Sequence, residues 1–150
     1  KQKRPPAIRP RLAESVADKT PPPGVMIRRG NTGQSRSLVN EAQVEETLRK
    51  RGFTIIDPAA MTVEEIVQKT SGTPIIVGVE GSHMNHGLLS LADRGTILTI
   101  QPPYRFNNVF KEFADCLDMT YALVVGTAVK GGFSVDVNKV METLDLAQQS

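Results

Sequence analysis

From residue 24 to residue 150, short apolar runs alternate with longer amphipathic segments, and this alternation leaves few folds open to the chain. Such runs are typical of strands buried in a mostly parallel sheet, because each parallel pair needs a helical crossover. The runs that we interpret as strands are Val25–Ile27, Phe53–Ile56, Ile75–Val77, Thr96–Ile100 and Tyr121–Val125. The pattern predicts an α/β fold, a Rossmann-like parallel sheet of about five strands with helices on both faces.

The segments between the runs carry helix signals. Asn40 and Gln43 have the spacing of a capping box, and they predict a helix that runs to about Arg51 and ends at Gly52. The other predicted helices are marked by caps or by inward-facing positions: Thr62 and Glu65 as a second capping box with Val63, Ile66, Val67 and Thr70 on one stripe; a stretch to about Leu91; Phe110, Phe113 and Leu117; and Val137, Val140, Met141 and Leu144.

The first part of the chain differs from the rest in composition. Residues 1 to 37 hold nine of the 18 lysines and arginines and only two acidic residues, a net charge of +7, while the remainder carries −5. Residues 1–23 also contain six of the ten prolines. We interpret residues 1–23 as a basic proline-rich linker or the edge of a missing N-terminal domain, with one short helix near Leu12 to Ala17, and residues 24–150 as the folded domain.

Composition disfavours several classes of function. The single cysteine, Cys116, cannot form an internal disulfide or a multi-cysteine zinc cluster. No run of about 18 apolar residues is present to span a bilayer. Nucleic-acid binding is disfavoured because much of the basic excess lies in the leader, and because only Tyr104-Arg105-Phe106 places a basic residue between two aromatic rings.

The loop after Val77 is the strongest candidate binding site. In open parallel sheets the ligand lies outside the carboxyl ends of the strands, and here Gly78 and Gly81 flank Glu80 just before a predicted helix start. Free backbone N–H groups at such a start attract a phosphate, and an acidic side chain beside it can accept hydrogen bonds from ribose hydroxyls. The alternative is that both glycines only form a tight turn and that Glu80 is solvated.

Arg28 and Arg29 follow the first predicted strand and would reach the same rim of the sheet. A guanidinium group can grip a diphosphate through two parallel hydrogen bonds, although a pair of surface cations is the commoner role of adjacent arginines. The next loop, Gly30 to Ser35, could bind an anion through its amides, but it lacks the Gly-Lys-Ser/Thr ending of a P-loop. No Gly-x-Gly-x-x-Gly is present, which argues against a nicotinamide or flavin enzyme.

Two histidines stand in the same region. His83 and His86 are three residues apart and could share one helical face. A zinc site would need a third ligand and a familiar motif around it, so we favour hydrogen bonding to a substrate or to the structure, with no metal.

These residues together resemble a known family. The order Ile27-Arg28-Arg29, Asn40-Glu41, Gly52-Phe53 with Asp57-Pro58, Ile76-Val77-Gly78-Val79-Glu80-Gly81-Ser82-His83 and Gln101-Pro102-Pro103-Tyr104-Arg105-Phe106 is similar to the C-terminal half of glycosyltransferase family 61, particularly its bacterial capsular-polysaccharide members. The resemblance runs from about Gly24 to about Val125. Many members have a histidine where this chain has Glu80, and a Gly-Leu-Thr-Asn run near His83-Met84-Asn85-His86, which affects base or sugar specificity.

The resemblance implies a function and a set of residues. It implies a two-Rossmann-domain enzyme in which this half binds a nucleotide-sugar donor, hexosyl or pentosyl transfer inverts the anomeric centre, and neither a metal nor a separate cofactor is needed. It places Arg28 on the diphosphate and Gly78, Glu80, Gly81 and Ser82 on the family's glycine turn; no catalytic residue is predicted. The full set of donor-binding residues that we expect is Arg28, Arg29, Gly78, Glu80, Gly81, Ser82, His83, His86 and Arg105.

The resemblance also implies partners and a location. The glycan acceptor would be bound largely by a missing N-terminal domain, so we expect the 150 residues to bind donor weakly or not to turn over alone. The expected location is the cytoplasm of a bacterium, with peripheral membrane association of the full enzyme, or the Golgi or endoplasmic reticulum lumen of a eukaryote. Two alternatives stay open: a Rossmann-like domain for NAD(P) or S-adenosylmethionine, and a non-catalytic interaction module.

Overall fold

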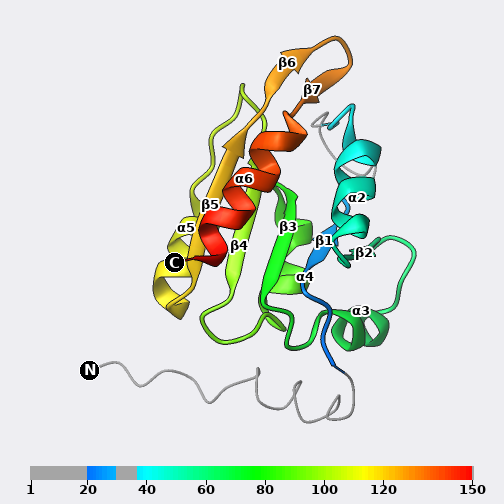
Figure 1. Ribbon diagram of the computed structural model, residues 1–150, viewed down its shortest axis with the longest axis vertical. Coiled ribbons are helices and arrows are strands. Elements are labelled where there is room, and N and C mark those ends of the chain that lie inside the picture. Colours follow the sequence, from blue (N-terminus) through cyan, green and yellow to red (C-terminus); the bar gives the residue numbers. More distant parts are fainter. Residues whose placement is uncertain (1–19, 30–36, 150) are drawn as a thin grey trace.

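The computed structural model describes residues 20–29 and 37–149. The predicted short helix near Leu12 to Ala17 and the Gly30 to Ser35 loop lie outside these ranges. Within them, five parallel strands form one sheet in the order β2-β1-β3-β4-β5, which confirms the predicted parallel α/β fold (Figure 1). The strands are β1 (Val25–Ile27), β2 (Thr54–Ile56), β3 (Ile75–Val79), β4 (Thr96–Gln101) and β5 (Thr120–Val125).

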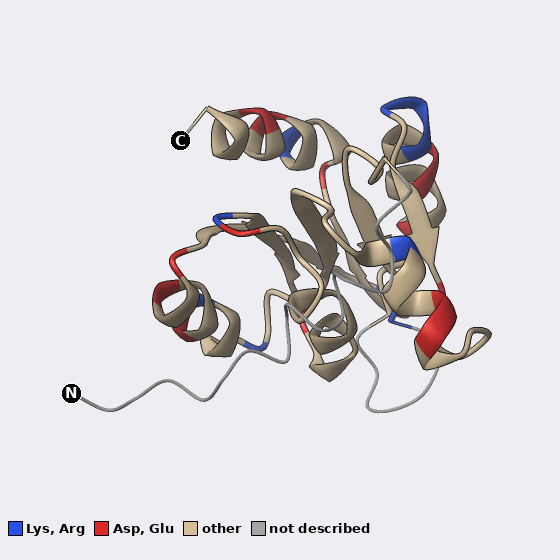
Figure 2. Ribbon diagram, turned by 90° about the horizontal axis from the view of Figure 1, so that it is seen from below, with Lys and Arg blue, Asp and Glu red and all other residues tan. Residues whose placement is uncertain are grey.

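Helices cover both faces of this sheet. One face packs against α2 (Glu41–Lys50) and α6 (Val137–Gln148). The other face packs against α3 (Val63–Thr70), the 3₁₀ turn η1 (Ser82–Met84), α4 (Asn85–Leu88) and α5 (Val109–Leu117). Charged residues lie on the helices and loops and none lies on a strand of the sheet, as Figure 2 shows.

The apolar runs form strands here because the sheet is covered on both sides. Alternate side chains of one strand enter two different cores: Val77 and Val79 face α2 and α6, whereas Ile76 faces the opposite helices. All residues of β3 and β4 are buried. Such near-continuous apolar strands are what a parallel sheet between two helical layers requires.

One predicted capping box is present and the other is wrong. The Thr62 hydroxyl accepts from the Glu65 N–H, and the Glu65 carboxylate accepts from the Thr62 N–H. Asn40 precedes α2 but makes no side-chain cap bond. Its amide instead pairs with the backbone of Val135, donating to the carbonyl at 2.8 Å and accepting from the N–H at 3.1 Å. A partner 95 residues away competes successfully with the local capping pattern.

Further predictions need correction. The helix expected up to about Leu91 is only η1 followed by the four-residue α4. Phe110 is buried as predicted, but Phe113 and Leu117 are partly exposed because Ala114 occupies the inward position between them. Val63 is exposed at the first turn of α3. A hairpin of β6 (Thr127–Val129) and β7 (Gly132–Ser134), which was not predicted, follows β5.

In the described part of the chain no helix combines the length and the apolar character needed to cross a membrane.

Candidate functional site

The strand order creates one point where a ligand site is expected. β1 and β3 are neighbours, but the connection after β1 leads to α2 on one face of the sheet and the connection after β3 leads to η1 and α4 on the other. The connections from these two neighbouring strands therefore lead to opposite faces of the sheet, and in open parallel sheets such a point, at the carboxyl ends of the strands, is where ligands bind. Arg28 and Arg29 follow β1, and Glu80 and Gly81 follow β3.

Arg29 links the segments that follow β1 and β3. Its Nη1 atom donates to the carbonyl oxygen of Glu80 at 3.0 Å. Glu80 is held in turn by β4, since its N–H donates to the Ile100 carbonyl oxygen at 3.0 Å. A guanidinium group that is fixed to the backbone at this rim carries a positive charge to the place where an anionic ligand would enter.

Glu80 itself is buried, with 2% of the residue exposed. One carboxylate oxygen accepts a hydrogen bond of 2.8 Å from the side-chain amide of Asn107, which lies just before α5. The interpretation of Glu80 as a solvated residue is therefore wrong. A buried carboxylate needs donors of this kind, and the bond fastens the loop after β4 to the turn after β3.

The glycines of the turn are needed because neighbours approach closely. A Cβ atom on Gly78 would lie 3.0 Å from the carbonyl oxygen of Ile27 and 3.2 Å from the Met84 side chain. A Cβ atom on Gly81 would lie 2.9 Å from His83 Nδ1 and 3.5 Å from Arg29 Nη1. The His83 ring and the Arg29 guanidinium therefore both stand against Gly81, although His83 comes from the segment after β3 and Arg29 from the segment after β1.

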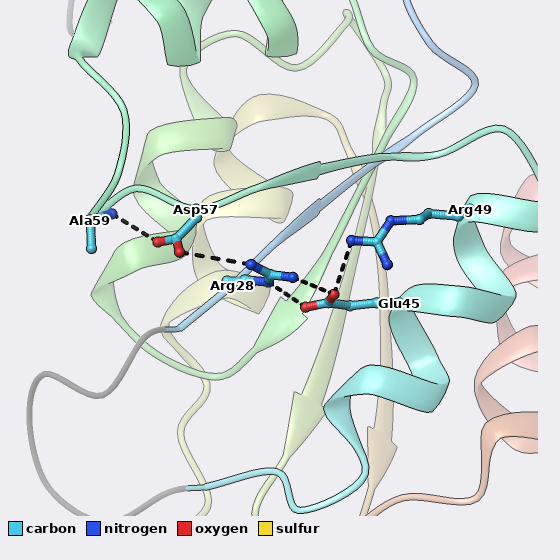
Figure 3. Close-up of polar contacts among 5 residues, drawn as sticks. All are labelled: Arg28, Glu45, Arg49, Asp57 and Ala59. Atoms are coloured by element: carbon cyan, nitrogen blue, oxygen red, sulfur yellow. Dashed lines mark hydrogen bonds and ion pairs between the residues drawn. The ribbon is translucent and has the colours of Figure 1, made fainter.

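Arg28 does not join them, contrary to the expectation that its guanidinium converges on the glycine turn. Its Nε and Nη2 atoms donate to the two carboxylate oxygens of Glu45 on α2, at 2.5 and 2.6 Å, and Nη1 lies 3.8 Å from Asp57, which follows β2 (Figure 3). Arg49 reaches the same Glu45 carboxylate at 3.2 Å. The physical reason is the pleat: adjacent residues leave a strand toward opposite faces, so only one of the two arginines can face the turn.

This ion-pair cluster shifts the protonation of its members. Hydrogen bonding from Arg28 lowers the pKa of Glu45 despite the burial of that carboxyl group. The same bond, opposed by partial burial, raises the pKa of Arg28. Burial and the neighbouring Glu45 raise the pKa of Glu41, at the first turn of α2, while Arg28 and the Arg29 backbone N–H act in the opposite direction. Arg28 thus joins the end of β1 to α2 and β2 through ion pairs with the carboxylates of Glu45 and Asp57.

The other expected site residues lie around the turn without forming one cluster. Ser82 is exposed in η1, His83 is partly buried there, and His86 is exposed in α4. Arg105 is exposed in the loop that follows β4. In residues 20–29 and 37–149 no group of three or more His, Cys, Asp or Glu side chains is placed to hold a metal ion.

Sequence reasoning missed two functional features of this region. Asn107 was not singled out, although the neighbouring Tyr104 to Phe106 belong to the stretch that carries the family resemblance and Arg105 was an expected donor-binding residue. The carboxylate partners of Arg28 were missed as well, although Asp57 stands directly after a predicted strand, where the carboxyl-end rule would have pointed to it.

The comparisons with known proteins give one family. The model of the family "Glycosyltransferase 61" matches residues 3–98, which is more than half of the chain and includes every expected site residue except Arg105. A search of curated proteins found no match.

Two solved structures are similar to this chain to different degrees. A flavodoxin-like domain from a Synechococcus sp. protein is 14% identical, with a TM-score of 0.56 over 84% of this chain and 96% of that one. The 2R,3R-butanediol dehydrogenase from Bacillus subtilis is 15% identical, with a TM-score of 0.42 over 96% of this chain and 44% of that one. The first likeness supports a parallel α/β fold of this size and, at this identity, nothing more specific.

Proposed function

The chain belongs to glycosyltransferase family 61, and from this premise we propose that its described domain binds the diphosphate of a nucleotide-sugar donor between the carboxyl ends of β1 and β3. One observation carries the proposal. Arg29, from the loop after β1, is bonded at 3.0 Å to the Glu80 carbonyl in the turn after β3, so a fixed guanidinium stands beside Gly81 at the strand-order switch.

The chemistry that this arrangement supplies is stabilisation of the leaving group. When the bond between the sugar and the diphosphate breaks, negative charge grows on the diphosphate oxygens. The Arg29 guanidinium has five N–H donors in a planar fork. By donating hydrogen bonds to two phosphate oxygens, it can stabilise the growing negative charge. Because one donor is held by the Glu80 carbonyl, the group is oriented before the charge develops.

In this proposal Arg29 takes the diphosphate role that the resemblance gave to Arg28. Arg28 already satisfies Glu45 through two short bonds, and releasing it would leave a buried carboxylate without its main partner. Ser82, His83, His86 and Arg105 remain candidate donor contacts around the same turn. Glu80 contributes through its carbonyl and its carboxylate as a group that orients Arg29 and Asn107.

The finer features of the reaction belong to the proposal as well. We infer inverting transfer to a glycan acceptor in polysaccharide synthesis, without a metal or a separate cofactor. An inverting transfer needs a general base near the acceptor hydroxyl. We place that base, and most of the acceptor site, in a second domain. The 150 residues alone are then expected to bind donor and to turn it over slowly or not at all.

Thermal unfolding of the full 150-residue chain with candidate ligands tests the proposal. A ligand that binds the native state raises the melting temperature by mass action. Nucleoside diphosphates should raise it, while a nicotinamide dinucleotide and S-adenosylmethionine should not. Arg29→Ala should abolish the ligand-dependent rise. It should lower the ligand-free melting temperature by only about 4 °C, because Arg29 is half-buried and loses a hydrogen bond worth about 1 kcal/mol to the Glu80 carbonyl.

Arg49→Ala is the matched control, because it removes an exposed arginine from α2 on the Glu45 side of the cluster. It should keep the full response to nucleoside diphosphates. A flat response of the unmodified chain to every nucleoside diphosphate, or a response that survives Arg29→Ala unchanged, contradicts the proposal. A response to the dinucleotide or to S-adenosylmethionine alone would favour the alternative class of Rossmann-like enzyme.

A further inference from the structure

The loop between β4 and α5 exposes two aromatic rings beside a cation. Phe106 has 71% of its residue surface exposed, the largest fraction among the large apolar residues of the described chain, and Tyr104 has 53%. Arg105, between them, is exposed as well. Burial of a phenylalanine ring is strongly favourable, so a ring displayed in this way indicates a surface that a partner covers.

The loop that displays these rings is tied down at its base. The Gln101 side-chain amide donates to the Asn107 carbonyl at 2.7 Å, which joins the two ends of the loop. The Asn107 side-chain oxygen accepts from the Val109 N–H at 3.1 Å, which fixes the start of α5. The Tyr104 ring meets the buried Phe133 ring edge to face, with 6.4 Å between the centroids. The rings are therefore presented by an ordered loop, which lowers the entropy cost of binding.

The same loop is continuous with the proposed diphosphate site. Asn107 donates to the Glu80 carboxylate at 2.8 Å, and the Glu80 carbonyl accepts from Arg29. Phe106 directly precedes Asn107, so the Cα atoms of these two residues lie about 3.8 Å apart. Asn107 is the residue bonded to the turn after β3. Figure 1 shows the segment after β4 rising at the carboxyl end of the sheet before it descends into α5. The loop that carries the two aromatic residues and the Arg29 guanidinium thus lie at the same edge of the sheet.

We propose that Phe106 and Tyr104 form the surface on which the nucleobase of the donor stacks, with Arg105 close to the ribose-phosphate part. The inference rests on the proposed function, because it takes a nucleotide as the ligand. A base has a flat π face that stacks on an aromatic ring, and the guanidinium plane of an arginine adds a cation–π contact.

Binding of two ligands that share the diphosphate and differ in the base tests this inference. Inorganic pyrophosphate carries the charge without a base, and a nucleoside diphosphate carries both. The full chain should bind the nucleoside diphosphate more tightly. Phe106→Ala should weaken that binding at least about fivefold, the effect expected for loss of one stacked base, and should leave pyrophosphate binding unchanged. Leu146→Ala is the matched control, since Leu146 is 66% exposed on α6, and it should change neither affinity.

A fluorescence measurement gives a second readout that does not depend on removing the ring. The chain contains no tryptophan, so Phe106→Trp introduces a single indole that can be followed alone. A stacked base should quench its emission and the affinity for the nucleoside diphosphate should be kept or improved. Pyrophosphate should leave the emission unchanged.

The outcomes separate the two proposals. If the nucleoside diphosphate binds but Phe106→Ala and Tyr104→Ala both leave its affinity unchanged, the stacking inference is overturned and the diphosphate site stands. If Phe106→Ala weakens pyrophosphate and the nucleotide equally, the loop acts on the anion site and stacking is again overturned. If neither ligand binds the unmodified chain, the proposed function fails and the inference fails with it.

Discussion

Arg28 and Glu45 form a two-pronged ion pair in which Nε and Nη2 of the arginine donate to the two carboxylate oxygens at 2.5 and 2.6 Å. The pair joins the end of β1 to α2, and 37% of the Arg28 side chain but only 5% of the Glu45 side chain is exposed. Arg29, the next residue in the chain, faces the turn after β3 instead. Two adjacent arginines thus have different environments: Arg28 is bonded to a carboxylate on α2, whereas Arg29 is bonded to the Glu80 carbonyl, the contact on which the proposed diphosphate site depends.

Loss of Arg28 should destabilise the fold. Arg28→Ala leaves the buried Glu45 carboxylate with only the longer contact to Arg49, and an unsatisfied buried acceptor of this kind costs about 1–3 kcal/mol of the free energy of unfolding. Urea unfolding at pH 7 measures the loss. Arg49→Ala removes an exposed contact to the same carboxylate and should cost less than about 1 kcal/mol. Equal effects of the two substitutions would show that the short pair is not the stabilising one.

Stability should fall in acid because of Glu45. Hydrogen bonding from Arg28 lowers its pKa in the folded state below the ordinary 4.5, so the unfolded chain binds the proton more readily. The contribution is then present above about pH 4.5 and is lost as the pH falls through the lowered value. Unfolding free energies between pH 3 and pH 7 should show a steeper acid decline for the unmodified chain than for Glu45→Gln. Parallel declines would exclude Glu45 as the titrating group.

Glu41 should have the opposite effect. Burial raises its pKa in the folded state, so the native chain holds this proton more readily than the unfolded chain does. Ionisation of Glu41 therefore costs stability as the pH rises from about 4.5 through the raised value. Glu41→Gln keeps an oxygen for the Arg29 backbone N–H and should stabilise the chain at pH 7 but not at pH 4. A loss of stability at pH 7 would contradict this account.

The position before α2 gives a test of how Asn40 acts. If Asn40 were an ordinary N-cap, Asn40→Asp would be neutral or stabilising. In the structure its amide donates to the Val135 carbonyl and its oxygen accepts from the Val135 N–H, and a carboxylate cannot donate. Asn40→Asp should therefore cost about 1–2 kcal/mol at pH 7. Thr62→Asp is the control, because Thr62 is a true cap and should tolerate the change.

The contrast between Asn40 and Thr62 shows how far the sequence could predict this fold. The five strands, the parallel sheet and the Thr62 cap depend on local pattern and burial, and they were predicted with boundaries close to those observed. The Asn40 contact joins residues 95 positions apart, and a local pattern contains no information about such a partner. The β6–β7 hairpin was missed because each of its strands has only three residues and β7 lacks an apolar run.

The candidate site was predicted in the same uneven way. The glycine turn and the two arginines could be placed at the carboxyl edge from the ends of the predicted strands alone. Which arginine faces the turn depends on the residue at which β1 ends and on the ion pair between Arg28 and Glu45. The pattern of apolar positions in α2 identifies Glu45 only as a polar residue and so does not predict this pair. Asn107 could not be found from spacing, since its bond to Glu80 joins two loops of different strands.

Gly81 provides the last prediction, because it separates crowding at the site from general strain. A Cβ atom there would lie 2.9 Å from His83 Nδ1 and 3.5 Å from Arg29 Nη1, so Gly81→Ala must displace the imidazole and crowd the guanidinium. The melting-temperature response to nucleoside diphosphates should then shrink. In the absence of ligand, the NMR signal of His83 should change and that of His86, the other histidine of the chain, should not.

Gly131→Ala is the control for this change. Gly131 lies in the β6–β7 turn with φ of +89° and no atom within 4 Å of an added Cβ, so alanine there costs about 1–2 kcal/mol of backbone strain and touches nothing. It should lower the melting temperature while keeping the response to ligand and both histidine signals. If Gly81→Ala leaves the ligand response and the histidine signals as they are in the unmodified chain, Gly81 is not required for the geometry of the site.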